Sequence, residues 1–203
     1  NPAATKYGLD KAIFGYGYTN ANVNLTNLVS NQGVVGSDVT GVGTARRNVA
    51  GTGFGLTGEA IFGYGYSNTH SNILNKVSSS GVVASDTTAA GTGSVSRGAA
   101  MYGSTGQAIF AFGETGGNAT AISNLCSNTG VVSTDVSAVG TARMYGAMSA
   151  YGGDKAIFAF GTDSSSKLNV SNKINNVGTV ASDTSGVGTA RSGLAALGYS
   201  LSA

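Results

Sequence analysis

One phrase recurs four times along the chain at a fixed interval. KAIFGYG at 11–17 returns as EAIFGYG, QAIFAFG and KAIFAFG, and successive copies begin 48 residues apart. Its first aromatic residue is Phe14, Phe62, Phe110 or Phe158. A period of this length indicates similar units that stack on one another, because a single unit cannot bury its apolar surface alone. The repeat therefore constrains the fold more than any other feature of the sequence.

Two further phrases follow each copy of the first. One reads QGVVGSD, SGVVASD, TGVVSTD and VGTVASD, and its aspartates are Asp38, Asp86, Asp135 and Asp183, spaced by 48, 49 and 48 residues. The other phrase, GVGTAR in the first unit, supplies Arg46, Arg143 and Arg191. The second unit has Ser94 at the corresponding position.

The repeated aspartates are expected to be structural. Each lies in a short polar turn, where its carboxylate can accept backbone N–H bonds. The arginine eight residues later is a candidate ion-pair partner, and its loss at Ser94 is consistent with a structural pair that lapses once. Convergence of the four carboxylates on one axial cation is the less favoured alternative.

Each unit has the pattern of several short strands. In 13–18 the aromatic residues Phe14, Tyr16 and Tyr18 alternate with smaller residues, which is the two-residue period of a strand. Glycine supplies 33 of the 203 residues and, with Asn, Ser and Asp, indicates tight turns. We expect about four strands per unit, no amphipathic helix, and an aromatic core between units instead of a base-stacking surface.

Four such units predict an all-β fold, namely a four-bladed β-propeller, with an open β-solenoid as the alternative. The segment 3–11 aligns with 195–203, so the N- and C-terminal segments can share the closing blade and remove an exposed sheet edge. We therefore expect a single repeat domain over residues 1–203. Its approximate units are 7–54, 55–102, 103–151 and 152–199.

The order of an AR phrase, an apolar strand, a glycine turn and an AIF-(G/A)-(Y/F)-G strand resembles the kelch-type propeller repeat. That resemblance implies one sheet per repeat. More closely, KAIFGYG, SNTGVV and GVGTAR resemble repeats of uncharacterised bacteriophage virion proteins. This second resemblance implies a tail, fibre or capsid-surface module, located on the virion surface or outside the cell. Its implied partners are a host-surface glycan or protein, or neighbouring virion proteins.

Residue types that carry chemistry are scarce. His70 is the only histidine and Cys126 the only cysteine, so neither a catalytic triad nor a zinc site is expected, and Cys126 is expected to be a small buried apolar residue. A net charge of +2 on scattered lysines and arginines does not indicate nucleic-acid binding. No apolar run is long enough for a membrane span. We expect no cofactor and no metal.

The segments after each AIF strand have the same length in all four units but differ in sequence. They read YTNANVN, YSNTHSN, ETGGNAT and TDSSSKL. In a ring, equivalent loops emerge on one face, so these four would form a polar rim suited to glycan or protein binding, although drift of unconstrained loops explains the variation equally well. The candidate ligand-binding residues on this rim are Tyr18, Asn20, Asn22, Tyr66, Asn68, His70, Glu114, Asn118, Asp163 and Ser165.

These features favour a non-catalytic adhesin or receptor-binding module. A purely structural spacer or decoration domain of a larger assembly is the first alternative. A glycan-cleaving enzyme is the second, and it would need a pair of positioned carboxylates, for which Glu59, Glu114 and Asp163 are the candidates. The sequence leaves the oligomeric state open.

Overall fold

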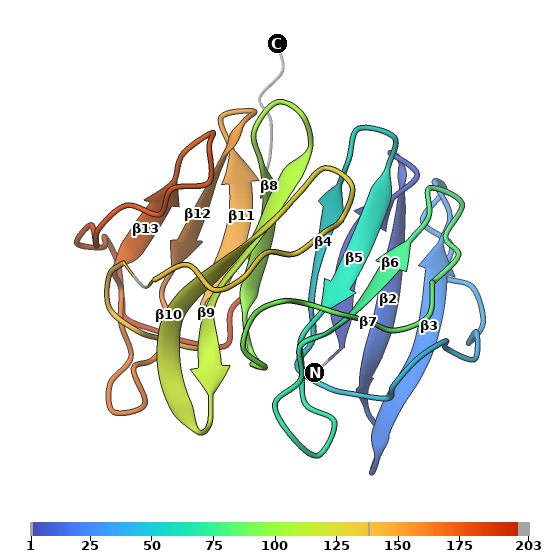
Figure 1. The fold of residues 1–203 in the computed structure, drawn as a ribbon, viewed down its shortest axis with the longest axis horizontal. Coiled ribbons are helices and arrows are strands. Elements are labelled where there is room, and N and C mark those ends of the chain that lie inside the picture. The colour runs from blue at the N-terminus through green and yellow to red at the C-terminus, as the bar shows by residue number, and fades with distance from the viewer. Residues whose placement is uncertain (1, 138, 199–203) are drawn as a thin grey trace.

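Figure 1 shows a computed structural model of the chain, in which residues 2–137 and 139–198 are described. These residues form four antiparallel β-sheets and no helix, so the prediction of an all-β fold is confirmed. In the described part of the chain there is accordingly no helix that could cross a membrane.

Each sheet follows the order of the chain, so that strands adjacent in sequence pair in space. The first sheet consists of β1 (Ala3–Tyr7), β2 (Lys11–Tyr18) and β3 (Asn22–Val29). The second consists of β4 (Ala50–Phe54), β5 (Glu59–Gly63), β6 (Ile73–Val77) and β7 (Thr87–Thr88). The third consists of β8 (Gly98–Tyr102), β9 (Gln107–Thr115) and β10 (Asn118–Cys126). The fourth consists of β11 (Ala147–Tyr151), β12 (Lys155–Ala159) and β13 (Ser171–Ile174).

A fourth strand is rudimentary in every sheet. Within the described part of the chain, only the second sheet has one long enough to be named, the two-residue β7, which pairs with β6. Elsewhere a single bridge takes its place, and these bridges are Thr26–Val39, Ser123–Val136 and Ser171–Thr184. The outermost polar turns of each unit are thereby held against the third strand by one or two backbone contacts.

Strand register places the repeated phenylalanine opposite an asparagine of the third strand in each sheet. Phe62 of β5 pairs with Gly51 of β4 on one side and with Asn75 of β6 on the other. The corresponding asparagines are Asn27, Asn124 and Asn172, opposite Phe14, Phe110 and Phe158. The third strand of each sheet therefore carries an asparagine at a fixed place, a regularity that becomes important where the sheets meet.

Consecutive sheets pack face to face through aromatic side chains. Tyr16 of the first sheet lies edge-on to Phe62 of the second, with ring centroids 5.3 Å apart. Tyr64 contacts Phe110 at the same distance, and Phe112 stacks on Phe158 at 4.3 Å. The first strands of neighbouring sheets are also in contact, β1 with β4, β4 with β8 and β8 with β11. The predicted aromatic core between units is confirmed.

The two aromatic residues of each phrase lie on opposite faces of their sheet, which differs from the expected two-residue alternation. Phe62 packs on the first sheet, whereas Tyr64 packs on the third. Tyr64 has a φ of 64°, in the left-handed region that a bulky residue rarely adopts. Its counterparts Tyr16, Phe112 and Phe160 have φ values of 60–62°. This local reversal of the strand turns the second ring toward the following sheet.

Candidate functional site

A buried arginine joins the first sheet to the second. The chain passes from one sheet to the next through Thr44 and Arg46, and the Arg46 side chain is fully buried. Its Nη2 donates to Asn75 Oδ1 at 2.6 Å and its Nε donates to the Tyr64 carbonyl at 2.8 Å, both in the second sheet. Its guanidinium carbon lies 4.2 Å from the ring centroid of Tyr16 in the first sheet. One cation thus contacts both sheets, through a ring on one side and hydrogen bonds on the other.

Asp86 completes this junction. It accepts hydrogen bonds from the Thr44 backbone N–H at 3.0 Å, from Thr44 Oγ1 at 2.7 Å and from Asn75 Nδ2 at 2.9 Å. Burial alone would raise the pKa of Asp86, but the bonds from Thr44 and Asn75 outweigh it and hold this pKa below its ordinary value. The carboxylate is therefore a charged cap on the segment that enters the second sheet.

The junction gives the repeated arginine a different partner from the expected one. The aspartate eight residues earlier, Asp38, lies on the far side of the first sheet and accepts from Asn27. Likewise, Arg143 Nη1 lies 3.8 Å from Asp183 Oδ1. Asp183 belongs to the following unit, whereas the expected partner, Asp135, belongs to the same unit as Arg143. The reason is topological: the arginine follows the strands of its own sheet in the chain, and it therefore packs against the next sheet.

The second junction keeps its cation although Ser94 replaces the arginine. Arg97, three residues later, donates to Asn124 Oδ1 at 2.8 Å and to Ser94 Oγ at 3.1 Å. Its guanidinium carbon lies 4.3 Å from the ring centroid of Tyr64, as Arg46 lies against Tyr16. The expected lapse of the pair in this unit therefore does not occur.

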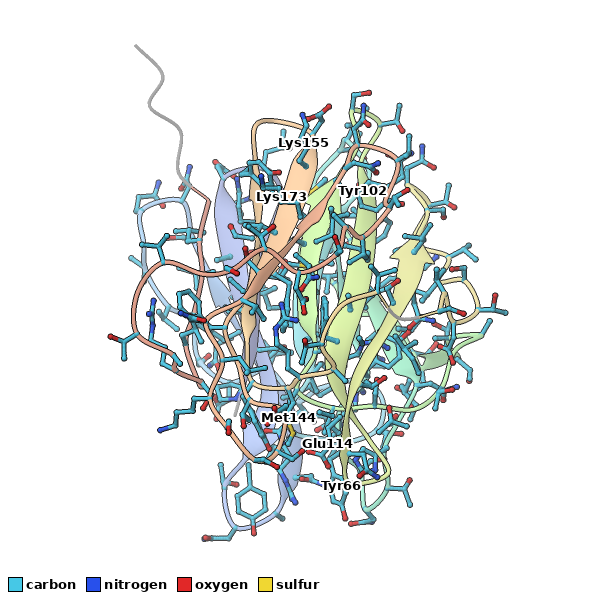
Figure 2. The ribbon with its side chains drawn as sticks, turned by 90° about the vertical axis from the view of Figure 1, so that its left-hand side faces the viewer. Tyr66, Tyr102, Glu114, Met144, Lys155 and Lys173 are labelled. Atoms are coloured by element: carbon cyan, nitrogen blue, oxygen red, sulfur yellow. The ribbon has the colours of Figure 1, made fainter. Side chains whose placement is uncertain are left out.

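A second group of predicted residues meets at the end of the sheets that carries the variable loops. The loops between the second and third strands of all four sheets lie at the lower end in Figure 1, and Figure 2 shows Tyr66 and Glu114 together at that end, with Lys155 and Tyr102 at the other. Glu114 Oε1 lies 3.1 Å from His70 Nε2, which joins the loop of the second sheet to the third sheet. His70 in turn lies edge-on to Tyr66, with ring centroids 5.9 Å apart.

Arg47 connects these residues to the first sheet. Its guanidinium carbon lies 5.1 Å from the ring centroid of Tyr18 and 4.6 Å from that of Tyr66, so the cation sits against both rings. Its Nη1 donates to Asn22 Oδ1 at 3.1 Å. We call these six residues the loop-end cluster: Tyr18, Asn22, Arg47, Tyr66, His70 and Glu114.

Sequence reasoning missed Arg47, although a signal was present. The corresponding positions of the other units hold Val95, Met144 and Ser192, so the charge at Arg47 is peculiar to one unit. The position precedes the first strand of a sheet, outside the segments whose variability drew attention to the rim.

The other predicted rim residues do not join the cluster. Asn20 and Asn68 are exposed turn residues with positive φ. Asn118 donates to the Gly116 carbonyl two residues away. Asp163 accepts from the N–H groups of Ser165 and Ser166, which closes its own turn and holds its pKa below the ordinary value. The fourth sheet therefore contributes loops to this end but no contact with the cluster among the described residues.

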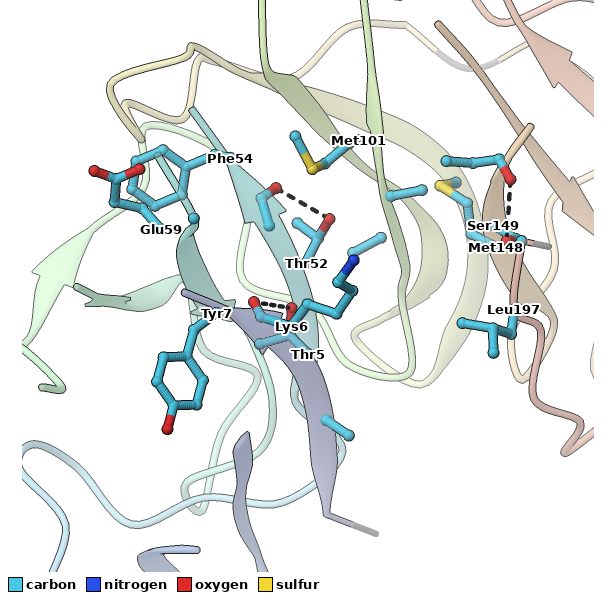
Figure 3. A pocket seen from close by; sticks show the side chains of 18 of the residues that line it. Thr5, Lys6, Tyr7, Thr52, Phe54, Glu59, Met101, Met148, Ser149 and Leu197 are labelled. Atoms are coloured by element: carbon cyan, nitrogen blue, oxygen red, sulfur yellow. Dashed lines mark hydrogen bonds between the residues drawn. The ribbon is translucent and has the colours of Figure 1, made fainter. Parts of the chain in front are cut away.

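The first strands of the four sheets surround a cavity of about 530 Å³ (Figure 3). Most of its lining is small, and its charged lining residues are Lys6 and Glu59. Thr5, Thr52 and Ser149 turn their hydroxyls to the carbonyl of the next residue, as the dashed lines in Figure 3 show. Glu59 is the one carboxylate among the cavity's described lining residues, whereas most glycoside hydrolases use a pair.

The three carboxylates considered for an enzyme lie apart. Glu59 begins β5 and accepts from Thr57, whereas Glu114 lies near the opposite end of β9 beside His70. The Asp163 carboxylate accepts a hydrogen bond from the Ser166 N–H group within its own turn. Among residues 2–137 and 139–198, no three His, Cys, Asp or Glu side chains lie close enough together to hold a metal ion.

No protein-family model matches this chain, and no curated protein matches it either.

Proposed function

We propose that this protein is a non-catalytic surface module that binds carbohydrate through the loop-end cluster. The observation that carries the proposal is the position of Arg47 between Tyr18 and Tyr66 at the end of the sheets. Flat aromatic faces suit the apolar faces of sugar rings, and a guanidinium suits their hydroxyl and carboxylate groups. Tyr18 is 54% exposed, so its ring is open to a ligand.

The charge of the cluster favours an acidic glycan. Glu114 lies beside His70, whereas Arg47 makes its one side-chain hydrogen bond among the described residues with the neutral Asn22. A guanidinium has five N–H donors, so Arg47 keeps donors for a ligand carboxylate or sulfate. The two rings fix the plane of the guanidinium before a ligand arrives, which reduces the entropy lost on binding.

Binding to an array of neutral and acidic glycans tests this proposal. We expect acidic glycans to bind the native protein and at least tenfold weaker binding by Arg47→Val, which copies the residue at Val95. Lys167→Ala is the matched control, because it removes one positive charge from an exposed loop at the same end but outside the cluster. No glycan binding, or equal binding by Arg47→Val, contradicts the proposal.

We place the four sheets as the blades of a four-bladed propeller whose seam between the fourth and first sheets is open. Face-to-face packing of consecutive sheets and a cavity bordered by all four first strands support this arrangement. An image-based average of the isolated chain tests it. Four sheets around one axis, with a gap between the fourth and the first, are expected, whereas a rod supports the solenoid alternative.

The proposed setting is the surface of a virion or another extracellular surface, which rests on the resemblance to phage virion repeats. Antibodies against the chain would then label intact particles. A purely structural role in a larger assembly is the second candidate, and the uncovered outer faces of the first and fourth sheets favour it.

A further inference from the structure

Each internal junction is built from two unlike surfaces. We call the face of a sheet that presents the repeated phenylalanine, asparagine and aspartate its front face. We call the opposite face, with the second aromatic ring and the arginine that follows the sheet, its back face. At the first junction, Tyr16 and Arg46 from the back of the first sheet meet Phe62, Asn75 and Asp86 on the front of the second. The second and third junctions repeat these contacts.

The front face of the first sheet is uncovered. Phe14 is 43% exposed, whereas its counterparts Phe62, Phe110 and Phe158 are fully buried. Val35 is 55% exposed, whereas Val83 and Val132 in the later units are buried. These residues are apolar in every unit, yet in the first sheet alone they face solvent.

The acceptor side chains on this face are present without their donors. Asn27 Nδ2 donates to Asp38 Oδ1 at 2.9 Å, as Asn75 donates to Asp86. In the described part of the chain, no threonine or arginine bonds to the Asp38 carboxylate or to Asn27 Oδ1, whose counterparts accept such bonds at the other junctions. The front face of the first sheet is thus half of a junction.

The back face of the fourth sheet carries the other half. The guanidinium carbon of Arg191 lies 3.8 Å from the ring centroid of Phe160, as Arg46 lies against Tyr16. Arg191 is exposed, and its side-chain hydrogen bond among the described residues is to the Thr189 carbonyl at 3.1 Å. Tyr151 is 39% exposed, whereas its counterparts Tyr7, Phe54 and Tyr102 are buried against the following sheet.

The backbone shows the same two halves. At each internal junction a glycine N–H group donates to a backbone carbonyl of the following sheet at 2.8 Å. The donor and acceptor pairs are Gly8 with Gly58, Gly55 with Gly106, and Gly103 with Asp154. Gly152 and Asp10 are the next pair in this series, and within the described residues they are not bonded. Side chains and backbone therefore agree on one missing junction.

We propose that a second copy of this chain supplies that junction, with its first sheet covering the fourth sheet of the copy before it. The two surfaces are complementary in charge, in hydrogen-bonding groups and in apolar residues, because they are halves of a contact that the chain already makes three times. Those three equivalent junctions leave the chain's own first sheet uncovered. An unlike-surface contact that does not close within a chain extends from one copy to the next.

The segment 195–198 must give way when the second copy binds. It aligns with the start of β1 and lies against Ala150 of β11, beside the cavity that β1 also lines. All four of its residues are exposed, whereas Ala3 and Tyr7 of β1 are buried. Exchange of this segment for the β1 strand of the incoming copy therefore replaces an exposed segment with a packed one.

Cysteine cross-linking tests the proposed contact and its direction. Thr44 Oγ1 lies 2.7 Å from Asp86 Oδ2 at the first junction, so Thr44→Cys with Asp86→Cys in one chain is the positive control for reach. Thr189→Cys and Asp38→Cys are the corresponding positions of the missing junction. When these two single variants are mixed and oxidised, we expect a disulfide-linked dimer. Thr189→Cys mixed with Thr105→Cys, in an exposed turn of the third sheet, should give none.

The double variant Thr189→Cys/Asp38→Cys separates the two ways of closing the seam. Linked chains of two or more copies support the proposal, whereas a monomer with an internal disulfide shows that the chain closes on itself and overturns it. The buried Cys126 is replaced by alanine in all variants to remove a competing thiol.

Charge exchange provides a second test that needs no cross-link. We expect sedimentation to show that the native chain assembles increasingly as its concentration rises. The affinity between copies should be at least tenfold weaker for Arg191→Glu and unchanged for Lys167→Glu. A mixture of Arg191→Glu with Asp38→Lys should recover one contact and form dimers. A monomer at all concentrations, or assembly unaffected by Arg191→Glu, overturns the proposal. Glycan binding through Arg47 is independent of this result.

Discussion

Arg97 donates a hydrogen bond to Asn124 Oδ1 at 2.8 Å, and this contact restores at the second junction what the repeat loses where serine stands at position 94. Arg97 is almost fully buried, and burial lowers its pKa, as it also lowers that of Arg46 and brings that of Arg143 to about 10. A buried guanidinium is costly unless it is hydrogen-bonded. Its recurrence at every internal junction, even from a shifted sequence position, shows that the junction geometry requires a cation there.

Exchange of the two residues at the second junction tests this equivalence. We expect Arg97→Ser to lower the free energy of unfolding by about 3 kcal/mol, because Asn124 Oδ1 and the Phe110 and Ile122 carbonyls then lose their buried donor. The double variant Ser94→Arg/Arg97→Ser places arginine at the position equivalent to Arg46 and should regain most of that loss. Urea unfolding measures both values. A double variant as unstable as Arg97→Ser would show that the two positions are not equivalent.

Tyr64→Phe should stabilise the protein. The Tyr64 hydroxyl is buried and has no hydrogen-bond partner among residues 2–137 and 139–198, while its counterparts Phe112 and Phe160 lack the hydroxyl altogether. Removal of an unsatisfied buried group is worth about 1 kcal/mol. Thermal unfolding measures the gain, and Tyr18→Phe, whose hydroxyl is on an exposed residue, is the control expected to change little. A lower melting temperature for Tyr64→Phe would indicate a partner for the hydroxyl in solution.

The Cys126 thiol should be unreactive in the folded protein. It is buried, and burial raises its pKa to about 12, so very little thiolate is present at pH 8. We expect slow modification by a disulfide reagent in buffer and rapid modification in denaturant. Thr189→Cys, on an exposed residue, is the fast-reacting control. Rapid reaction of native Cys126 would mean that the third strand of the third sheet opens readily.

The sequence period was sufficient to predict the all-β class, the equivalence of the units and the aromatic core. It could not predict the partner of the arginine, because proximity in sequence favoured Asp38 for Arg46, whereas the chain crosses to the next sheet before Arg46 is placed. The observed partner is Asn75 of the second sheet, which in turn bonds to Asp86, and both lie a whole strand or more beyond Arg46 in sequence.

The faces of the aromatic residues and the loop-end cluster were harder to predict for different reasons. Phe14 and Tyr16 are two residues apart and should share a face, but the left-handed backbone at Tyr16 reverses the strand. Tyrosine as a residue type does not predict a left-handed backbone conformation. Arg47 contacts Tyr18 and Tyr66 only because neighbouring sheets bring their ends together, which a repeat alignment does not show.

Acid should weaken the internal junctions. The pKa values of Asp86, Asp135 and Asp183 are held below the ordinary value because hydrogen bonds from threonine and asparagine outweigh the effect of burial. In the unfolded chain these groups bind protons near pH 4, earlier than in the folded protein. The stability they contribute is therefore present above about pH 4 and is lost as the pH falls through their folded pKa values.

Asp135→Asn isolates one of these groups. It should be less stable than the native protein at neutral pH, because Asn124 and Thr92 lose a charged acceptor, and its stability should fall less steeply as the pH drops below about 4. Urea unfolding at a series of pH values gives both slopes. Between pH 6 and pH 8 the slopes of the two proteins should coincide, since the aspartate is ionised in both states there. Equal slopes in acid would show that Asp135 binds its proton with the same affinity folded and unfolded, and that Thr92 and Asn124 do not hold its charge.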